Sequence, residues 1–176
     1  MNLFAVAPLW LVIILALALI AGAVEDAMRL RISNATPIAV IVTAAVAMAA
    51  TGPSMLLWQN FALFFLVLVL GTVAFSAGLL GGGDVKLLAA VSMWVDLRSG
   101  LLLIAAILVG GGLVAIGYIL AGLISGRGMK SSRERRIPYG LAIAAGGLLV
   151  IGLARQEPPR PAQPMHVAIA DAQPGR

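Results

Sequence analysis

Two aspartates, Asp26 and Asp84, are the residues whose type and position could support catalysis. Asp26 follows a long uncharged run, and Asp84 follows three glycines and precedes a short apolar stretch. A carboxylate at the centre of a membrane helix costs about 2.5–3.5 kcal/mol on insertion scales, so an aspartate kept near such a position suggests a function. Two carboxyl groups in one partly dry site share a proton. The ionised group can take a proton from water while the protonated group polarises a carbonyl, which is the chemistry of aspartic peptide hydrolysis.

The composition indicates a membrane protein. The 176 residues are 61% hydrophobic and 11% charged, with a mean hydropathy of +1.06, whereas soluble domains are about 25% charged. A soluble enzyme, a disordered protein and a disulfide-linked secreted domain are therefore excluded. The chain has no cysteine and one histidine, so we expect no metal site and no cofactor. The net charge of +5 comes mainly from short segments between apolar runs, and we expect no nucleic-acid partner.

The apolar runs predict an all-α polytopic protein with about six transmembrane helices, one transmembrane domain over 1–154 and a proline-rich disordered tail over 155–176. The expected spans are 3–24, 36–50, 55–80, 84–97, 101–124 and 138–154. The fourth is short: the uncharged stretch from Leu87 to Val95 covers roughly 14 Å. Either this helix does not span, or its Asp84 end lies below the membrane surface, with the glycines before it in a non-helical backbone.

The distribution of cations predicts the orientation. With both termini on the outer, periplasmic side, eight cations lie inside and four outside, which satisfies the positive-inside rule. Asp26 and Asp84 then share the inner face. Taken alone, Asp26 is more simply a solvated loop carboxylate, whereas the short helix and the glycines favour a buried Asp84. The three tryptophans are expected at the membrane interface: Trp10, Trp58 and Trp94.

Three segments resemble the active-site segments of the type IV prepilin peptidases, which are aspartic membrane proteases with a Gly-x-Gly-Asp motif. The segment from Gly81 to Ala90 resembles their second active-site segment, including a lysine two residues after the aspartate. Asp26 and the segment 29–34 resemble the first, with Ser33 in place of a proline. The segment 136–140, Arg-Ile-Pro-Tyr-Gly, is similar to the start of their last helix. The tail lies outside the resemblance.

The resemblance implies an endopeptidase of the bacterial inner membrane whose active site faces the cytoplasm. It would cut the basic leader from prepilins or pseudopilins, with Asp26 and Asp84 as the catalytic pair and without a cofactor. Without cysteines or room for an additional cytoplasmic domain, the chain is closer to the compact form associated with Flp-type tight-adherence pili, and methyltransferase activity is not expected. Five further residues of these segments are expected to shape the site: Gly81, Gly83, Lys86, Asn34 and Pro138.

Simpler interpretations remain open for two of these residues. Lys86 could tune Asp84 or contact substrate, but a side chain extending to the interface is the simpler explanation. Asn34 could hydrogen-bond in the site or cap a turn. Membrane lipid is the only other partner expected, and the oligomeric state is open.

A function from another class is also consistent with intramembrane carboxylates. A non-catalytic transporter or pilus-assembly protein would use them as a proton relay. Broken helices occur in such proteins too, but their internal repeat is not detectable here.

Overall fold

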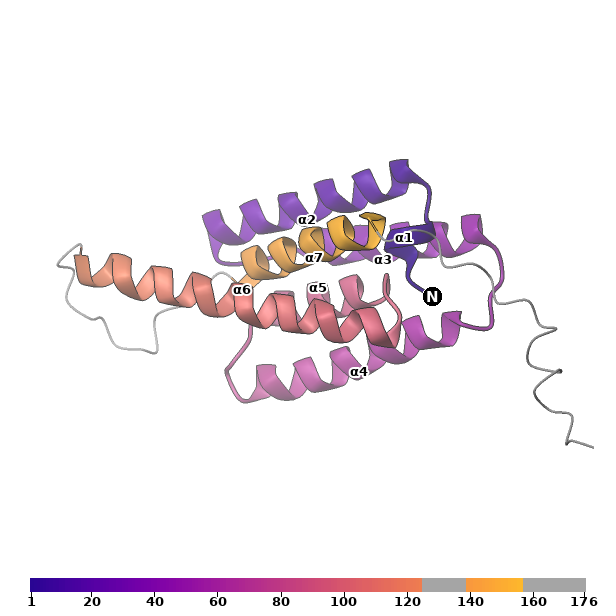
Figure 1. The fold of residues 1–176 in the computed structure, drawn as a ribbon. Helices are drawn as coiled ribbons and strands as arrows, with labels where there is room; N and C mark the ends of the chain where they lie inside the picture. The colour runs from indigo at the N-terminus through magenta and orange to yellow at the C-terminus, as the bar shows by residue number, and fades with distance from the viewer. Residues whose placement is uncertain (125–138, 157–176) are drawn as a thin grey trace, which may run out of the picture.

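The computed structural model describes residues 1–124 and 139–156, and within these residues the fold is entirely helical. From α2 to α7, successive helices run in opposite directions in a single bundle (Figure 1). Their bounds are α1 Leu3–Val6, α2 Leu9–Arg29, α3 Ala35–Thr51, α4 Leu57–Ser76, α5 Gly82–Ser92, α6 Leu97–Ile124 and α7 Tyr139–Gln156. The predicted all-α class is confirmed.

Three helices, α2, α4 and α7, are long and apolar enough to cross a membrane, and α3 and the segment Leu97–Leu113 of α6 are shorter apolar helices. Apolar side chains on their outer faces are exposed, which suits a lipid environment. By contrast, α5 has 11 residues and a length of about 17 Å, too short for a span.

The first apolar run does not form the single helix that we expected. It breaks between Val6 and Leu9, giving the short helix α1 and then α2. Pro8 lies at this break with φ −52° and ψ 141°, and proline has no N–H to continue a helical hydrogen-bond ladder. Asn2 caps α1 by accepting a hydrogen bond from the N–H of Phe4.

The glycines before Asp84 also differ from the expectation. Gly82 and Gly83 form the first turn of α5 and are not in an irregular backbone. A positive φ occurs earlier, at Gly78 in the turn after α4, where it is 75°. Glycine is required at position 83 for another reason, namely space, since a Cβ there would lie 3.0 Å from Ile32 Cβ.

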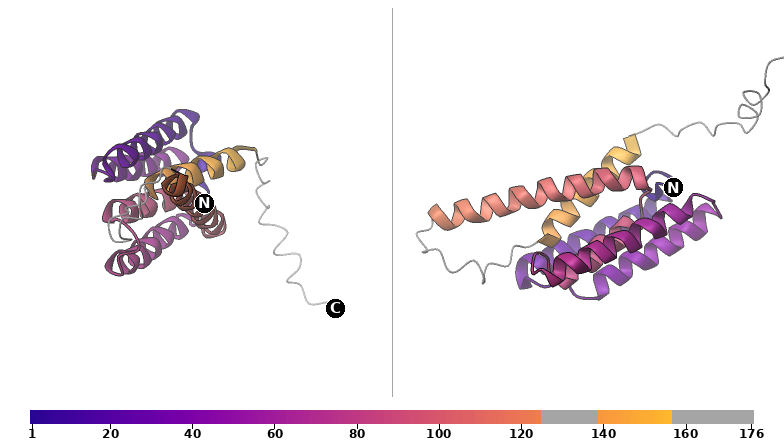
Figure 2. Two further views of the ribbon diagram at one scale, coloured as in Figure 1. Left: turned by 90° about the vertical axis from the view of Figure 1, so that its left-hand side faces the viewer. Right: turned by 90° about the horizontal axis from the view of Figure 1, so that it is seen from below.

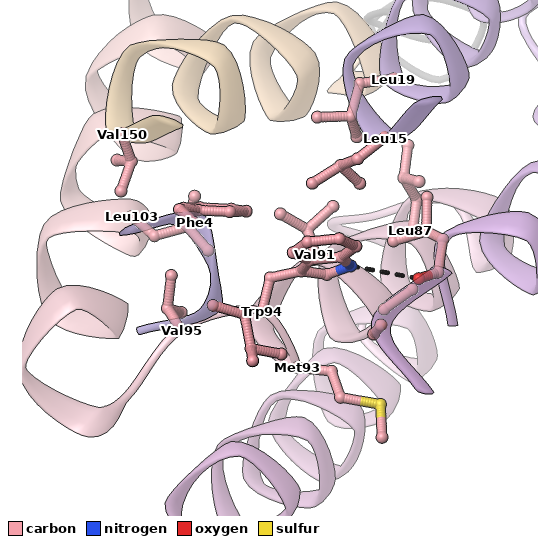
Figure 3. Packing of buried hydrophobic residues seen from close by; sticks show 14 of the residues in the cluster. Phe4, Leu15, Leu19, Leu87, Val91, Met93, Trp94, Val95, Leu103 and Val150 are labelled. Atoms are coloured by element: carbon pink, nitrogen blue, oxygen red, sulfur yellow. Dashed lines mark hydrogen bonds between the residues drawn. The ribbon is translucent and has the colours of Figure 1, made fainter. Parts of the chain in front are cut away.

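The hydrophobic core surrounds α5, which packs against α3, α4 and α7. Trp94 follows α5 and is fully buried, so its predicted interfacial position is wrong. Its ring stacks on Phe4 with centroids 5.9 Å apart, and its indole N–H donates to the carbonyl of Val40 at 3.1 Å. Figure 3 shows Leu15, Leu19, Val91 and Leu103 packed around this pair. Trp10 and Trp58 are exposed.

Different helix ends meet at the two ends of the bundle. The end of α2, the start of α5 and the start of α7 lie together at one end, where α6 extends past the other helices (Figures 1 and 2). The opposite end holds α1, the start of α6 and the end of α7. There the Arg155 guanidinium donates to the carbonyl of Ala7 at 2.6 Å.

Candidate active site

A cavity of about 410 Å³ lies at the end of the bundle where α2 ends and α5 begins. Both aspartates singled out from the sequence line it, although 58 positions separate them in the chain. Four of the expected site-shaping residues line it as well: Gly81, Gly83, Lys86 and Asn34. Pro138, the fifth, lies outside the described residues.

Asp26 is a buried residue of α2, 4% exposed, and not the solvated loop carboxylate that its position alone suggested. Its Oδ2 atom accepts a buried hydrogen bond of 2.7 Å from the backbone N–H of Gly140. Gly140 is the second residue of α7, and the first N–H groups of a helix have no partner inside the helix. The start of α7 therefore supplies a donor, and a positive helix end, to this carboxylate.

Gly140 leaves the space that this hydrogen bond needs. A Cβ at position 140 would lie 2.9 Å from Asp26 Oδ2 and 2.9 Å from Ile32 Cδ1. A larger residue would displace the side chain of Asp26 or Ile32, or α7 itself. A glycine here is thus a direct requirement of the site.

Asp84 lies in the first turn of α5 and is 8% exposed. Its Oδ2 accepts a 3.2 Å hydrogen bond from the N–H of Gly81, whereas the buried Oδ1 atom has no partner among the described residues. Burial, and next the negative charge of Asp26, raise the pKa of the Asp84 carboxyl to about 6, despite the opposing effect of the Gly81 hydrogen bond. Desolvation and a nearby like charge both favour the protonated form. The two carboxyl groups are thus in different environments.

Ile32 connects the segments that carry the two aspartates. It is 6% exposed and lies in the loop between α2 and α3. Its backbone passes so close to Gly83 that a Cβ there would meet the Ile32 carbonyl at 3.1 Å, and its Cδ1 lies against Gly140. The side chain therefore packs between the starts of α5 and α7.

Two polar contacts hold the same loop in place. The Lys86 ammonium donates to Asn34 Oδ1 at 2.9 Å, so Lys86 bridges α5 and the loop. Asn34 precedes α3 but makes no side-chain cap. On the other side of the loop, Glu25 Oε2 accepts a 3.0 Å hydrogen bond from the N–H of Ser33.

The roles of Ile32 and Gly140 were not recognised from the sequence. Both belong to the segments that carry the resemblance, but nothing local to either shows that they meet across 108 positions. Among residues 1–124 and 139–156, no three metal-ligating side chains come together.

The family model for the type IV leader peptidase family matches residues 13–125. The chain belongs to the type IV leader peptidase family. The match includes Asp26 and Asp84, so membership indicates a membrane protease of the leader-peptidase type, whose substrates are prepilins. The start of α7 lies beyond the matched residues. No match was found among curated proteins or solved structures.

Proposed function

We propose that this protein is an aspartic endopeptidase that removes the cytoplasmic leader from Flp-type prepilins, with Asp26 and Asp84 as the catalytic pair. The observation that carries the proposal is that both buried aspartates line one cavity. Family membership supports the leader-peptidase activity. The absence of cysteine from the sequence supports the assignment to the Flp-type group and to leader removal without methylation.

The unequal environments of the two carboxyl groups support different catalytic roles, one as the base and the other as the acid. Asp26, which accepts the amide N–H of Gly140, is the ionised member that takes a proton from the attacking water. Asp84, whose pKa is raised to about 6, is the protonated member that donates to the oxygen of the scissile carbonyl. Water adds to the carbonyl carbon to give a gem-diol. The proton taken by Asp26 then passes to the leaving amine as the C–N bond breaks, and one hydroxyl proton returns to Asp84 as the C=O bond re-forms.

The membrane position follows from the charges near the cavity. Arg31 and Lys86 line it, and cations mark the cytoplasmic side of a membrane protein. We therefore place the cavity at the cytoplasmic face of the bacterial inner membrane. There it reaches the junction between the leader and the membrane-embedded helix of a prepilin.

The test is co-expression with the Flp-type prepilin of the same genome, followed by mass measurement of the pilin. We expect Asp26→Asn and Asp84→Asn each to abolish leader removal while the protein still inserts. Asp96→Asn is the matched control, because Asp96 lies at the opposite end of the bundle and caps α6 through a 2.8 Å bond from the N–H of Ser99. Full processing by both active-site variants would refute the proposal and leave the proton-relay function as the better account.

A further inference from the structure

Arg31 is an exposed cation in the wall of the cavity that holds Asp26 and Asp84. The other cation of this wall, Lys86, donates to Asn34 Oδ1, whereas the Arg31 guanidinium donates to none of the residues that the structure describes. A guanidinium presents five N–H donors in a planar fork that fits an anion with two oxygens. Arg31 is therefore available to an anionic group that enters the cavity.

The start of α5 offers further donors to the same cavity. Gly82 and Gly83 line it and are the first two residues of this helix. The first N–H groups of a helix have no partner inside the helix, and no side chain caps α5. Over the described part of the chain, neither of the two N–H groups has an acceptor. A helix start of this kind carries a partial positive charge and favours an anion.

A buried side-chain atom at this place points independently to a ligand. Asp84 is 8% exposed, and its Oδ1 atom has no hydrogen-bond partner among the described residues. Leaving such an atom unpaired is costly. Because Asp84 is the protonated member of the catalytic pair in the proposed mechanism, it can donate to an oxygen that also accepts from the start of α5.

We propose that Arg31 and the start of α5 form a binding site for the carboxylate that cleavage creates at the end of the leader. The inference rests on the proposed peptidase function and adds a product site to the same cavity. Hydrolysis converts the neutral scissile carbonyl into a carboxyl group, which is ionised at neutral pH. The other product, the pilin, gains an amine, which Arg31 would repel.

The site distinguishes the product from the substrate by charge. An uncut prepilin presents an uncharged amide to Arg31, whereas the released leader presents a carboxylate. The ionised Asp26 repels this carboxylate, and a nearby cation offsets the repulsion. The leader should therefore remain bound after cleavage through its new terminus.

Two synthetic leader peptides test the site. They share the leader sequence of the prepilin and a fluorescent label at the N-terminus, and they end in a free carboxylate or in a carboxamide. The measurement is the Kd of each peptide for the purified protein in detergent, from fluorescence anisotropy. For the wild type we expect the carboxylate peptide to bind at least about 10-fold more tightly than the carboxamide, because hydrogen bonds between charged groups are the stronger ones.

Arg31→Gln should bring the two Kd values to within about 3-fold of each other, since the carboxylate loses the charge that it pairs with. Arg29→Gln is the matched control. Arg29 is also exposed and ends α2 only two positions earlier, but it lies outside the cavity lining. This variant loses the same charge and should keep the wild-type difference.

Gly82→Pro tests the helix start, because proline has no N–H but suits the first position of a helix. Gly81 has φ −77° and ψ 147°, the extended conformation that a following proline favours. Gly82→Ala keeps the N–H, and its Cβ would lie in ordinary contact, 3.5 Å from Phe75 Cε2. The proline variant should reduce the preference for the carboxylate peptide, and the alanine variant should retain it.

Three results would overturn the product site. The wild type would bind both peptides equally, Arg29→Gln and Arg31→Gln would reduce the difference equally, or Arg31→Gln would raise KM for the prepilin and leave the difference intact. The last result would assign Arg31 to an acidic group of the uncut substrate. All three are compatible with leader removal, whereas a wild-type protein that cuts no prepilin would contradict the proposed function itself.

Discussion

Asp26 owes its place in the site to a residue 114 positions further along the chain. The N–H of Gly140 donates to Asp26 Oδ2 at 2.7 Å, and no such donor reaches the buried Oδ1 of Asp84 from the described residues. In a pair of carboxyl groups, differences in environment separate the acid from the base. In the mechanism that we propose, the N–H of Gly140 favours the ionised form of Asp26, which acts as the base.

Gly140→Ala should lower kcat for leader removal by at least about 10-fold, because small displacements of a catalytic group are costly. The new Cβ would lie 2.9 Å from Asp26 Oδ2 and force the carboxyl out of place. KM should change little, since the substituted position faces Asp26 and Ile32. The measurement is a substrate titration with the purified protein in detergent.

Gly152→Ala is the control for this variant. It lies on the same helix, and a Cβ there would meet nothing within 4 Å. An equal loss of activity in both variants would show that α7 merely tolerates no substitution. Wild-type kcat in Gly140→Ala would contradict the positioning role.

The raised pKa of Asp84 predicts a dependence of stability on pH. The folded pKa is about 6 against an ordinary 3.8, so the folded protein holds a proton that the unfolded chain has released. The stabilisation is fully present below pH 3.8 and is lost as the pH rises through about 6. The unfolding temperature of the detergent-solubilised protein should fall over this window. Asp84→Asn should reduce the fall, and equal slopes for both proteins would contradict the prediction.

Among the elements, α5 is the one whose length could be predicted from the sequence and whose burial could not. Its short length left two possibilities, a helix that does not span or an Asp84 end below the membrane surface, and the 11-residue helix is too short to span. Its burial between α3, α4 and α7 was not predictable, because the apolar residues of α5 form the same sequence pattern whether lipid or protein surrounds them. For the same reason Trp94 was assigned to the interface, whereas it packs on Phe4.

The packing of α4 on α5 depends on Gly71. A Cβ at this position would lie 2.7 Å from Val85 Cγ1, and Val85 is the residue after Asp84. Gly71→Ala should destabilise the protein by about 1–3 kcal/mol through overpacking and lower activity by displacing Asp84. The measurements are thermal unfolding and leader removal.

Val85→Ala removes the methyl groups that the new Cβ would meet. The double variant should therefore be less destabilised than the two single variants together, since residues in contact are not additive. Gly117→Ala, with open space at its Cβ, is the control on α6. Strict additivity of the two changes would show that α4 and α5 do not meet at Gly71.

At the scale of the whole molecule, the apolar helix α6 extends further than the site at the cavity end of the bundle. The helix lines a second cavity beside Asp84 at Gly112 and continues to Ile124, a further distance of up to about 18 Å. Figure 2 shows it extending past the other helices at this end. The aspartates therefore lie below the level at which α6 ends. The contacts of Asp26, by contrast, could not be predicted from the sequence, because they depend on where the start of α7 lies in the fold.

The orientation of the bundle can be tested with single cysteines, because the chain has none of its own. Leu79, 67% exposed, lies between α4 and α5 at the cavity end, and Met55, 93% exposed, lies between α3 and α4 at the opposite end. Arg31 and Lys86 line the cavity, and both belong to the inner segments of the expected topology, so that end should face the cytoplasm. A membrane-impermeant maleimide should label Met55→Cys in spheroplasts and Leu79→Cys only in inverted membrane vesicles. The reverse pattern would place Asp26 and Asp84 on the periplasmic side, where they could not reach a cytoplasmic leader, and the proposed substrate would be wrong even if both aspartates proved catalytic.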